Sequence, residues 1–242
     1  MEKIIYILTK HENKSTEEFK DLLINKFSPE IDNLTQSIQI NVVDDAVSKT
    51  NLSRVGQEAE NQLPNSPVAD GMLAVWVRSI SFKNQIESIL KIFTKSFHGY
   101  LVTESEALPS TTLPTLPISR TTGFDQVAFL QKPLNQPYNE WLYNWQTLHT
   151  QVAIDTQSTC RYTQNIVVRS ITEKAPNYQA IVEEGYPDES AMFDPMVFYD
   201  SVGDQNKMIK NIELMMESCS KFIDFESQPT DLIGMSQYIV KK

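Results

Sequence analysis

The spacing of apolar residues in the first hundred positions predicts four strands and two helices. Short runs rich in β-branched and aromatic residues are typical of strands, and they occur at 2–10, 37–43, 71–80 and 100–103. Longer runs with apolar residues three or four positions apart are typical of amphipathic helices, and they occur at 15–27 and 81–97. Ser15 and Glu18 match a capping box at the start of the first helix. We expect Pro29 to end this helix and Gly99 to end the second.

The second half of the chain repeats this order of elements. Strand patterns occur at 125–132, 160–171, 178–185 and 232–240, and helix patterns at 138–152 and 205–222. Between the halves, residues 108–123 are rich in Pro, Ser and Thr, which indicates a linker or a strap across the surface. We therefore divide the chain into a first repeat at 1–107, a Pro-rich linker at 108–123 and a second repeat at 124–242.

A shift of 122 positions supports an internal duplication. It aligns residues 3–28 with 125–150 without a gap, with the identical pairs Leu8/Leu130, Lys10/Lys132, Asn13/Asn135 and Glu18/Glu140. The segment Gln39–Val43 also resembles Gln164–Val168. Each β-α-β-β-α-β unit forms an antiparallel sheet with helices on one face, so the two remaining sheet faces must cover each other. We predict an α+β protein of two ferredoxin-like repeats packed as an intramolecular barrel, either a monomeric pseudo-dimer or a homodimer.

The composition argues against several kinds of partner and cofactor. The net charge of −10 and the pI of about 4.8 argue against nucleic acid and anionic membranes as partners, because a protein that binds either one needs a basic patch. Because no run has transmembrane length and the apolar stretch 4–8 is too short for a signal peptide, we expect no membrane association and a cytoplasmic location. Cys160 and Cys219 form no metal-binding spacing, and the seven glycines form no phosphate loop. We expect no metal and no cofactor.

The helix predicted at 138–152 carries the most distinctive side chains. Its apolar stripe consists of Trp141, Trp145, Leu148 and Val152. His149 lies on or beside this stripe, and an imidazole beside an apolar pocket can act as a general base or acid. His149 is therefore the first candidate catalytic residue, although a core histidine that bonds to backbone has the same pattern. Trp141 and Trp145 can stack on an aromatic ligand or simply fill the core.

Three polar residues on the following strand are candidate partners of His149. Tyr162 and Gln164 share one face of the strand and Asn165 lies on the other, so only one set can face the helix. Tyr162 is the second candidate catalytic residue, as a proton donor or an orienting group. Gln164 and Asn165 are the alternative ligand-binding amides, and ordinary sheet packing remains open for each residue.

Two further positions are candidates for ligand binding. Glu183 and Glu184 are neighbours on a strand and point to opposite faces, so they form no acid–base pair and only one can point inward. We take Glu183 as the candidate, with a solvated turn as the alternative. Phe198 belongs to the insertion 187–201, which reads as a pocket lid, a hydrophobic strap or a dimer contact.

The second half resembles the EthD domain of the dimeric α+β barrel superfamily, over roughly residues 124–242. The resemblance rests on four segments. Glu140–Val152 is a helix with an early aromatic residue and a late histidine, and Arg161–Val168 is an R-Y-x-Q-N-like strand. Tyr178–Met192 is a strand that runs into an acidic turn, and Lys221–Pro229 is a hydrophobic–acidic ending. The first Asp of the family's ending is absent, and Glu217 or Ser218 lies near that place. The first half resembles the family only in element order, with Phe27 where the second has His149.

The resemblance implies a small-molecule pocket between the sheet and the helices of the second repeat. Related barrels include cofactor-independent monooxygenases, cyclases and dehalogenase-like enzymes, together with members of unknown activity. EthD-like proteins are associated with degradation pathways and with polyketide-type aromatic metabolism. The expected partner is therefore a small hydrophobic or aromatic ligand.

Two functions of different classes follow. The first is a cofactor-independent enzyme on small aromatic or polyketide-like molecules, with His149 as acid or base, and it predicts a cavity with His149 on its wall. The second is a non-catalytic small-molecule-binding or stress-associated structural protein. It predicts a His149 that is buried and saturated with hydrogen bonds, or a pocket filled by side chains.

Overall fold

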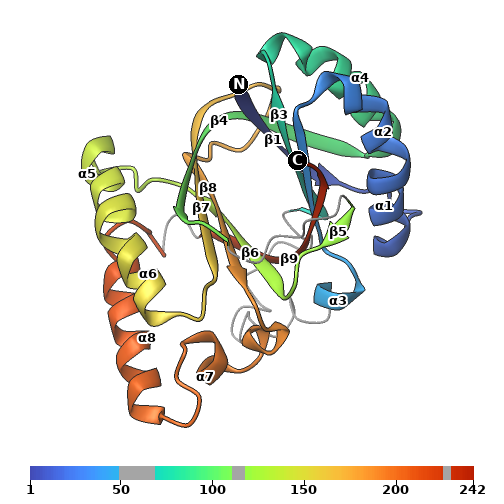
Figure 1. Ribbon diagram of the computed structural model, residues 1–242. Coiled ribbons are helices and arrows are strands. Elements are labelled where there is room, and N and C mark those ends of the chain that lie inside the picture. The colour runs from blue at the N-terminus through green and yellow to red at the C-terminus, as the bar shows by residue number, and fades with distance from the viewer. Residues whose placement is uncertain (49–68, 111–117, 226–229) are drawn as a thin grey trace.

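Eight strands close into an antiparallel barrel in the computed structural model, which describes residues 1–48, 69–110, 118–225 and 230–242 (Figure 1). Around the barrel the order is β2-β3-β1-β4-β7-β8-β6-β9, and β9 pairs back with β2. The pairings β4–β7 and β2–β9 join the strands of the first half to those of the second. The strands are β1 (Glu2–Thr9), β2 (Ser37–Val42), β3 (Gly71–Val77), β4 (Ser96–Leu108), β6 (Phe124–Leu130), β7 (Arg161–Ser170), β8 (Ala180–Tyr186) and β9 (Asp231–Lys241), with a short β5 (Ser119–Arg120) beside β9.

The helices lie outside the barrel and cover its two flanks (Figure 1). The first half contributes α1 (Thr16–Leu22), a π-helical segment η1 (Leu23–Phe27), α2 (Ser28–Ile31), η2 (Asp32–Leu34), α3 (Asp45–Ser48), η3 (Ile80–Phe82) and α4 (Lys83–Phe93). The second half contributes α5 (Tyr138–Leu142), a π-helical segment η4 (Tyr143–His149), α6 (Thr150–Thr156), η5 (Glu189–Met192), α7 (Pro195–Phe198) and α8 (Gln205–Cys219). No helix in these described ranges has the length and apolar character needed to cross a lipid bilayer.

The alternation of side chains along the strands divides the core into layers. On β1, Ile4, Tyr6 and Leu8 point outward and pack under the first-half helices, whereas Ile5 and Ile7 point into the barrel. The strands of the second half repeat this division, with one apolar cluster inside the barrel and another beneath α5, α6 and α8. Because successive side chains of a strand point to opposite faces, every strand contributes to both an inner and an outer layer.

The predicted antiparallel α+β barrel is present, but two predicted helix ends are wrong. The first helix does not end at Pro29, because the chain continues helically through α2 and η2. A π-helical segment precedes Pro29, and Ser28 Oγ donates to the Leu23 carbonyl at 2.8 Å. Pro29 then lies in the first turn of α2, where a missing N–H is tolerated.

Gly99 does not end the second helix. That helix ends at Phe93, and Gly99 lies within β4, which pairs with β1. A Cβ at position 99 would come within 2.7 Å of the Tyr6 ring, so the glycine allows Tyr6 to cross close to the backbone. The sequence signal at Gly99 therefore reflects close packing in the sheet rather than a helix cap.

Candidate functional site

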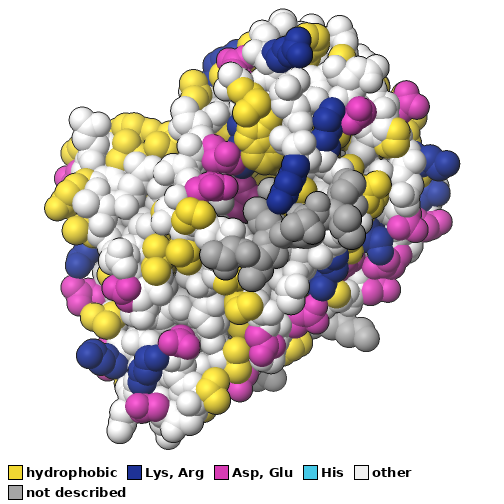
Figure 2. Space-filling model, in the orientation of Figure 1, with side chains coloured by type: hydrophobic (Ala, Val, Ile, Leu, Met, Phe, Trp, Pro, Cys, Tyr) yellow, Lys and Arg dark blue, Asp and Glu magenta, His cyan; other side chains and the backbone are white. Residues whose placement is uncertain are grey.

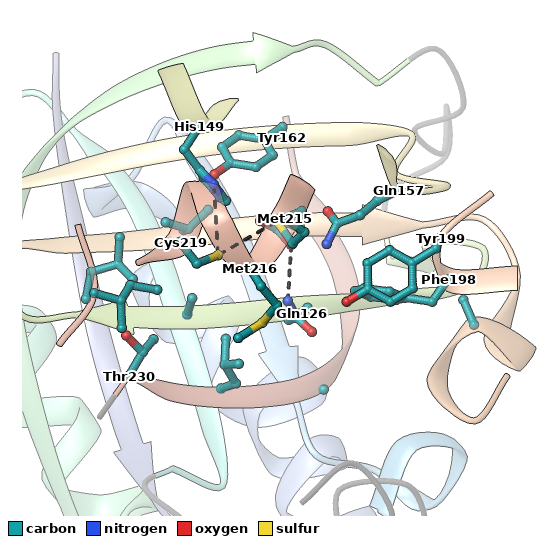
Figure 3. A pocket seen from close by; sticks show the side chains of 18 of the residues that line it. Gln126, His149, Gln157, Tyr162, Phe198, Tyr199, Met215, Met216, Cys219 and Thr230 are labelled. Atoms are coloured by element: carbon teal, nitrogen blue, oxygen red, sulfur yellow. Dashed lines mark hydrogen bonds between the residues drawn. The ribbon is translucent and has the colours of Figure 1, made fainter. Parts of the chain in front are cut away.

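A cavity of about 630 Å³ lies between the outer face of the second-half strands and the helices that cover them (Figure 3). Strands β6, β7, β8 and β9 form its floor, the helical run Tyr138–Thr156 and α8 form its walls, and the segment with η5 and α7 closes one side. The lining is mostly apolar and aromatic, and its polar members include Gln126, His149, Gln157, Tyr162 and Glu184. Its volume lies within the range of pockets that bury small organic ligands, roughly 300–1,000 Å³.

The π-helical segment η4 decides which side chains of the long helix face the cavity. The Thr150 hydroxyl donates to the Trp145 carbonyl, five residues earlier, at 3.2 Å. A π-helical turn contains more residues than an α-helical turn, so the positions after Trp145 rotate out of the α-helical phase. As a result His149 is buried while Leu148, which the α-helical stripe placed inside, is 39% exposed. The predicted stripe is wrong at Leu148 for this reason.

His149 lies on the wall of the cavity and bonds to α8. Its Nδ1 is 4.0 Å from Cys219 Sγ (Figure 3). The same nitrogen is 3.1 Å from Ser218 Oγ, and the His149 ring packs on Phe222 at 4.6 Å between centroids. We assign the Ser218 hydroxyl as the donor to Nδ1, because among the described residues it has no other hydrogen bond. The proton of the neutral ring is then on Nε2. Burial lowers the pKa of His149 to about 4, so the ring is neutral at physiological pH.

Tyr162 faces the same cavity from β7, between Trp145 and Cys219. Burial raises the pKa of the Tyr162 hydroxyl well above its ordinary value, and the charge of Glu184 raises it further. Burial also raises the pKa of the Cys219 thiol to about 12. The indole N–H of Trp145 lies near the Tyr162 hydroxyl but makes no full hydrogen bond. Tyr162 and Cys219 are therefore protonated groups that can donate hydrogen bonds.

Glu184 is the carboxylate in this cavity, and sequence analysis selected its neighbour instead. Gln126 Nε2 donates to Glu184 Oε2 at 3.1 Å, and the Tyr186 hydroxyl donates to the same oxygen at 3.0 Å. Only 6% of Glu184 is exposed. The two-residue alternation showed that one of the two glutamates points toward the helices, but it could not show which one. The deciding fact is the register of β8, in which Val182, Glu184 and Tyr186 share the outer face.

Phe198 closes one side of the cavity. Its ring stacks on Tyr186 at 4.9 Å between centroids, and Tyr186 stacks on Phe124 at 5.0 Å. The short helices of this segment begin at capping aspartates, since Asp188 accepts from the Ser190 N–H and Asp194 from the Met196 N–H. The insertion is thus an ordered wall of the cavity.

Four of the candidate residues lie outside this cavity. Trp141 is fully buried beside it, where its indole N–H donates to the Phe222 carbonyl at 3.1 Å. Gln164 faces the helices as Tyr162 does, but its amide donates to Thr150 Oγ1 at 2.6 Å within the packed layer. Asn165 and Glu183 point into the barrel, where Asn165 Nδ2 donates to Glu183 Oε1 at 3.0 Å. The structure therefore divides the candidates between the two sides of the barrel wall.

The barrel interior holds a polar network at one end. Lys3 Nζ is 3.2 Å from Glu183 Oε1 and also pairs with Glu104. Gln39 donates to Glu183 and to Asn41, and Asn41 donates to Asp125 at 2.8 Å. Arg161 pairs with Asp125 through Nη2. This network joins β1 and β2 of the first half to β6, β7 and β8 of the second. No group of three or more His, Cys, Asp or Glu side chains suited to a metal ion occurs in the described ranges.

The comparisons with known proteins support the fold. No known family and no curated protein matches the sequence. A solved structure described as an anthrone oxidase-like protein aligns with 100% of this chain and 94% of its own, at 11% identity and a TM-score of 0.52. Two others score lower: a provisionally assigned monooxygenase from Lactobacillus acidophilus NCFM (99% and 95% covered, 11% identity, TM-score 0.48) and a dye-decolorizing peroxidase from Bacteroides thetaiotaomicron VPI-5482 (99% and 92% covered, 10% identity, TM-score 0.44). At 11% identity, the likeness to the anthrone oxidase-like protein shows only a shared fold, that of the dimeric α+β barrels.

Proposed function

We propose that the protein is a cofactor-independent enzyme that binds small aromatic or polyketide-like molecules in the cavity between β6–β9 and their helices. One observation carries this proposal. A single cavity of about 630 Å³, with a mostly apolar and aromatic wall, holds a buried carboxylate (Glu184), a buried neutral imidazole (His149) and a buried phenol (Tyr162). Polar groups of this kind, set in an apolar pocket, are typical of sites that orient a ligand and move a proton.

Glu184 is the group we assign as proton acceptor. A carboxylate held within hydrogen-bond reach of a bound substrate can accept an acidic O–H or C–H proton from it. Gln126 and Tyr186 hold one of its oxygens in place. His149 presents an N–H at Nε2 by our tautomer assignment, and Tyr162 presents a hydroxyl. Both can stabilise negative charge that develops on a phenolate or enolate oxygen of the substrate.

The assignment to an EthD-like domain belongs to this proposal. It rests on the sequence resemblance of the second half and on the position of the cavity, because the residues that line the cavity belong to that half. Within this proposal, the protein aligned at a TM-score of 0.52, described as anthrone oxidase-like, suggests fused-ring aromatic ketones as first probes.

We also infer that the chain is a tandem duplication of ferredoxin-like repeats. Two observations support this inference. The strands of each half pair in the same order, β2-β3-β1-β4 and β7-β8-β6-β9. In addition, the bond from Ser28 Oγ to the Leu23 carbonyl and the bond from Thr150 Oγ1 to the Trp145 carbonyl lie one repeat shift of 122 positions apart. In each, the acceptor carbonyl belongs to a π-helical segment and the donor is the first residue after it.

A ligand screen by thermal shift tests the binding step. Phenols, quinones and fused-ring aromatic ketones including anthrone are added to the wild type, to His149→Ala and to Glu184→Gln. A compound that binds the cavity raises Tm of the wild type by mass action, and we expect both variants to reduce that shift. His11→Ala, which changes a histidine outside the cavity lining, is the matched control and keeps the full shift. If no compound raises Tm of the wild type, the proposal is wrong.

Proton transfer is measured separately from binding. A bound ketone with an acidic C–H is incubated in D2O, and NMR follows the exchange of that proton. We expect exchange that is faster than the buffer background and slower by a hundredfold or more in Glu184→Gln, in line with the usual contribution of a general base. Binding without enhanced exchange or turnover supports the non-catalytic small-molecule binder instead.

A further inference from the structure

The cavity between the second-half strands and their helices, called the helix-side cavity from this point, has polar and apolar parts that differ in exposure. Its acid–base side chains, His149, Tyr162 and Glu184, are all buried. The exposed residues among its described lining are all apolar, and they are Phe193, Pro195, Met216, Phe225 and Leu232. The cavity therefore has a polar floor and an apolar mouth, and these five are its mouth residues.

Four of the mouth residues are large and more than half exposed. The exposed fractions are 60% for Phe193, 51% for Met216, 51% for Phe225 and 54% for Leu232. They come from three segments of the chain, namely the residue after η5, α8 with the residues that follow it, and β9. Because these separate segments line one cavity, their exposure marks the opening of that cavity to solvent.

An apolar mouth of this kind differs from the ordinary surface of a protein. On the face drawn in Figure 2, hydrophobic side chains occur mostly in small, separate groups among polar ones. Apolar residues that are exposed singly need no special explanation. Large apolar residues that gather around the entrance of a cavity are typical of a surface that a ligand or a partner covers.

The position of the mouth residues favours one occupant over the others. Each of them also lines the cavity, so a protein that covered them permanently would close the cavity to its ligand. A ligand whose own apolar part leaves through the mouth covers these residues while it occupies the cavity. The volume of about 630 Å³ equals that of about twenty water molecules at roughly 30 Å³ each, which leaves room for a chain beside an aromatic ring. No Lys or Arg occurs among the described lining residues, so the lining offers no cation to an anionic chain.

We propose that the ligand of the helix-side cavity is an amphipathic molecule with an aromatic head and an uncharged alkyl chain. The head lies at the polar floor beside Glu184, His149 and Tyr162, and the chain runs out past the mouth residues. This inference rests on the function proposed above and specifies its class of ligand. The mouth residues then determine specificity for the chain, and the flexible thioether of Met216 can adapt to chains of different length.

Isothermal titration calorimetry of the full chain with a series of 4-alkylphenols tests the proposal. The methyl, propyl, pentyl and heptyl compounds share one head and differ only in the length of the chain. Because burial of a methylene group strengthens binding, we expect Kd to fall about threefold for each methylene that is added. Binding of the methyl compound with no gain from longer chains overturns this inference and leaves the proposed function standing. If none of the four compounds binds, both are wrong.

A double variant locates the chain of the ligand. Met216→Gln/Leu232→Gln makes two exposed mouth residues polar, so the fold is retained, and the gain in affinity from the methyl to the heptyl compound should shrink at least tenfold. Ile209→Gln/Leu214→Gln is the matched control, because these α8 residues are 45% and 40% exposed and do not line the cavity. The control should keep the gain of the wild type. The same gain in the mouth variant as in the wild type overturns the proposal.

Sedimentation velocity without ligand tests the competing occupant, a second copy of this chain. We expect the wild type and the variant Met216→Gln/Leu232→Gln to have the same oligomeric state. A wild-type dimer that dissociates in the variant would assign the mouth to the second copy and overturn the proposal.

Discussion

Gly185 lies directly against the guanidinium of Arg161, its cross-strand partner on β7. A Cβ on Gly185 would fall well inside contact distance of Arg161 Cζ, Nε and Cγ. The absence of a side chain on β8 therefore makes room for a buried arginine to lie flat across the strand and reach Asp125. This relationship gives the polar end of the barrel its geometry, since Arg161 begins the chain of bonds that continues through Asp125 and Asn41.

We expect Gly185→Ala to destabilise the protein, because the added methyl group displaces Arg161 and leaves Asp125 buried without its cation. Breaking a buried ion pair costs on the order of 3 kcal/mol. Denaturant unfolding measures the change. Gly203→Ala is the control: a new Cβ there meets nothing within 4 Å, and only the positive φ of 83° opposes it. The Gly203→Ala substitution should lower the free energy of unfolding by about 1 kcal/mol. Equal losses in the two variants would show that contact with Arg161 is unimportant.

The burial of His149 predicts a specific pH dependence of stability. Its pKa falls from 6.5 to about 4 in the folded protein. Between pH 7 and 4 the unfolded chain therefore takes up a proton at this ring that the folded protein does not, so the free energy of unfolding falls as the pH falls. The full shift corresponds to on the order of 3 kcal/mol. His149→Gln lacks this titration and should lose less stability over the same range.

Denaturant unfolding at pH 7 and pH 4.5 gives the comparison. Other titrating groups contribute equally to the wild type and to His149→Gln, so the difference between their two pH-induced losses isolates the histidine. Parallel losses in both proteins would mean that the His149 ring is accessible to solvent and protons in the folded state.

Lys3 and Glu183 form a buried ion pair, in which each charge stabilises the other. Burial alone would raise the pKa of Glu183, but Lys3, Asn165 and Gln39 together hold it below its ordinary value. We expect Lys3→Met to destabilise the protein by on the order of 3 kcal/mol, because Glu183 keeps its charge without a cation. In the double variant Lys3→Met/Glu183→Gln, much of that loss should be recovered. A double-mutant cycle by denaturant unfolding measures the coupling, and additive losses would contradict it.

Glu184→Gln separates the charge of the helix-side cavity from its shape. The amide has nearly the same volume as the carboxylate, so we expect a small change in stability. A phenol that binds the wild type should bind the variant about tenfold more weakly, since a hydrogen bond to a carboxylate is stronger than one to an amide by roughly 1.4 kcal/mol. Titration calorimetry with the best phenol of the screen gives the ratio. Unchanged affinity would place the ligand away from Glu184.

The strand and helix patterns in the sequence predicted much of the fold, because each element keeps its apolar alternation or its helical spacing. They failed where local geometry departs from the ideal period. The π-helical segment η4 exposes Leu148, which the α-helical spacing placed inside, and no apolar pattern marked that change of phase. Likewise, the similar segments beginning at Gln39 and Gln164 place these glutamines on opposite sides of the barrel wall, since Gln39 bonds to Glu183 inside and Gln164 to Thr150 outside. A one-residue difference in register is enough to reverse a side chain.

The sequence by itself determined the order of elements and the antiparallel class of the barrel, and it singled out His149 and Tyr162, which both line the helix-side cavity. These follow from periodicity and from residue type, which are local properties. Only the tertiary structure decided that Glu184 faces the helices while Glu183 faces the barrel, and that Arg161, Asp125 and Lys3 meet inside it. Those outcomes depend on strand register and on contacts between residues more than 30 positions apart, such as the 36 between Asp125 and Arg161, and no local pattern encodes them.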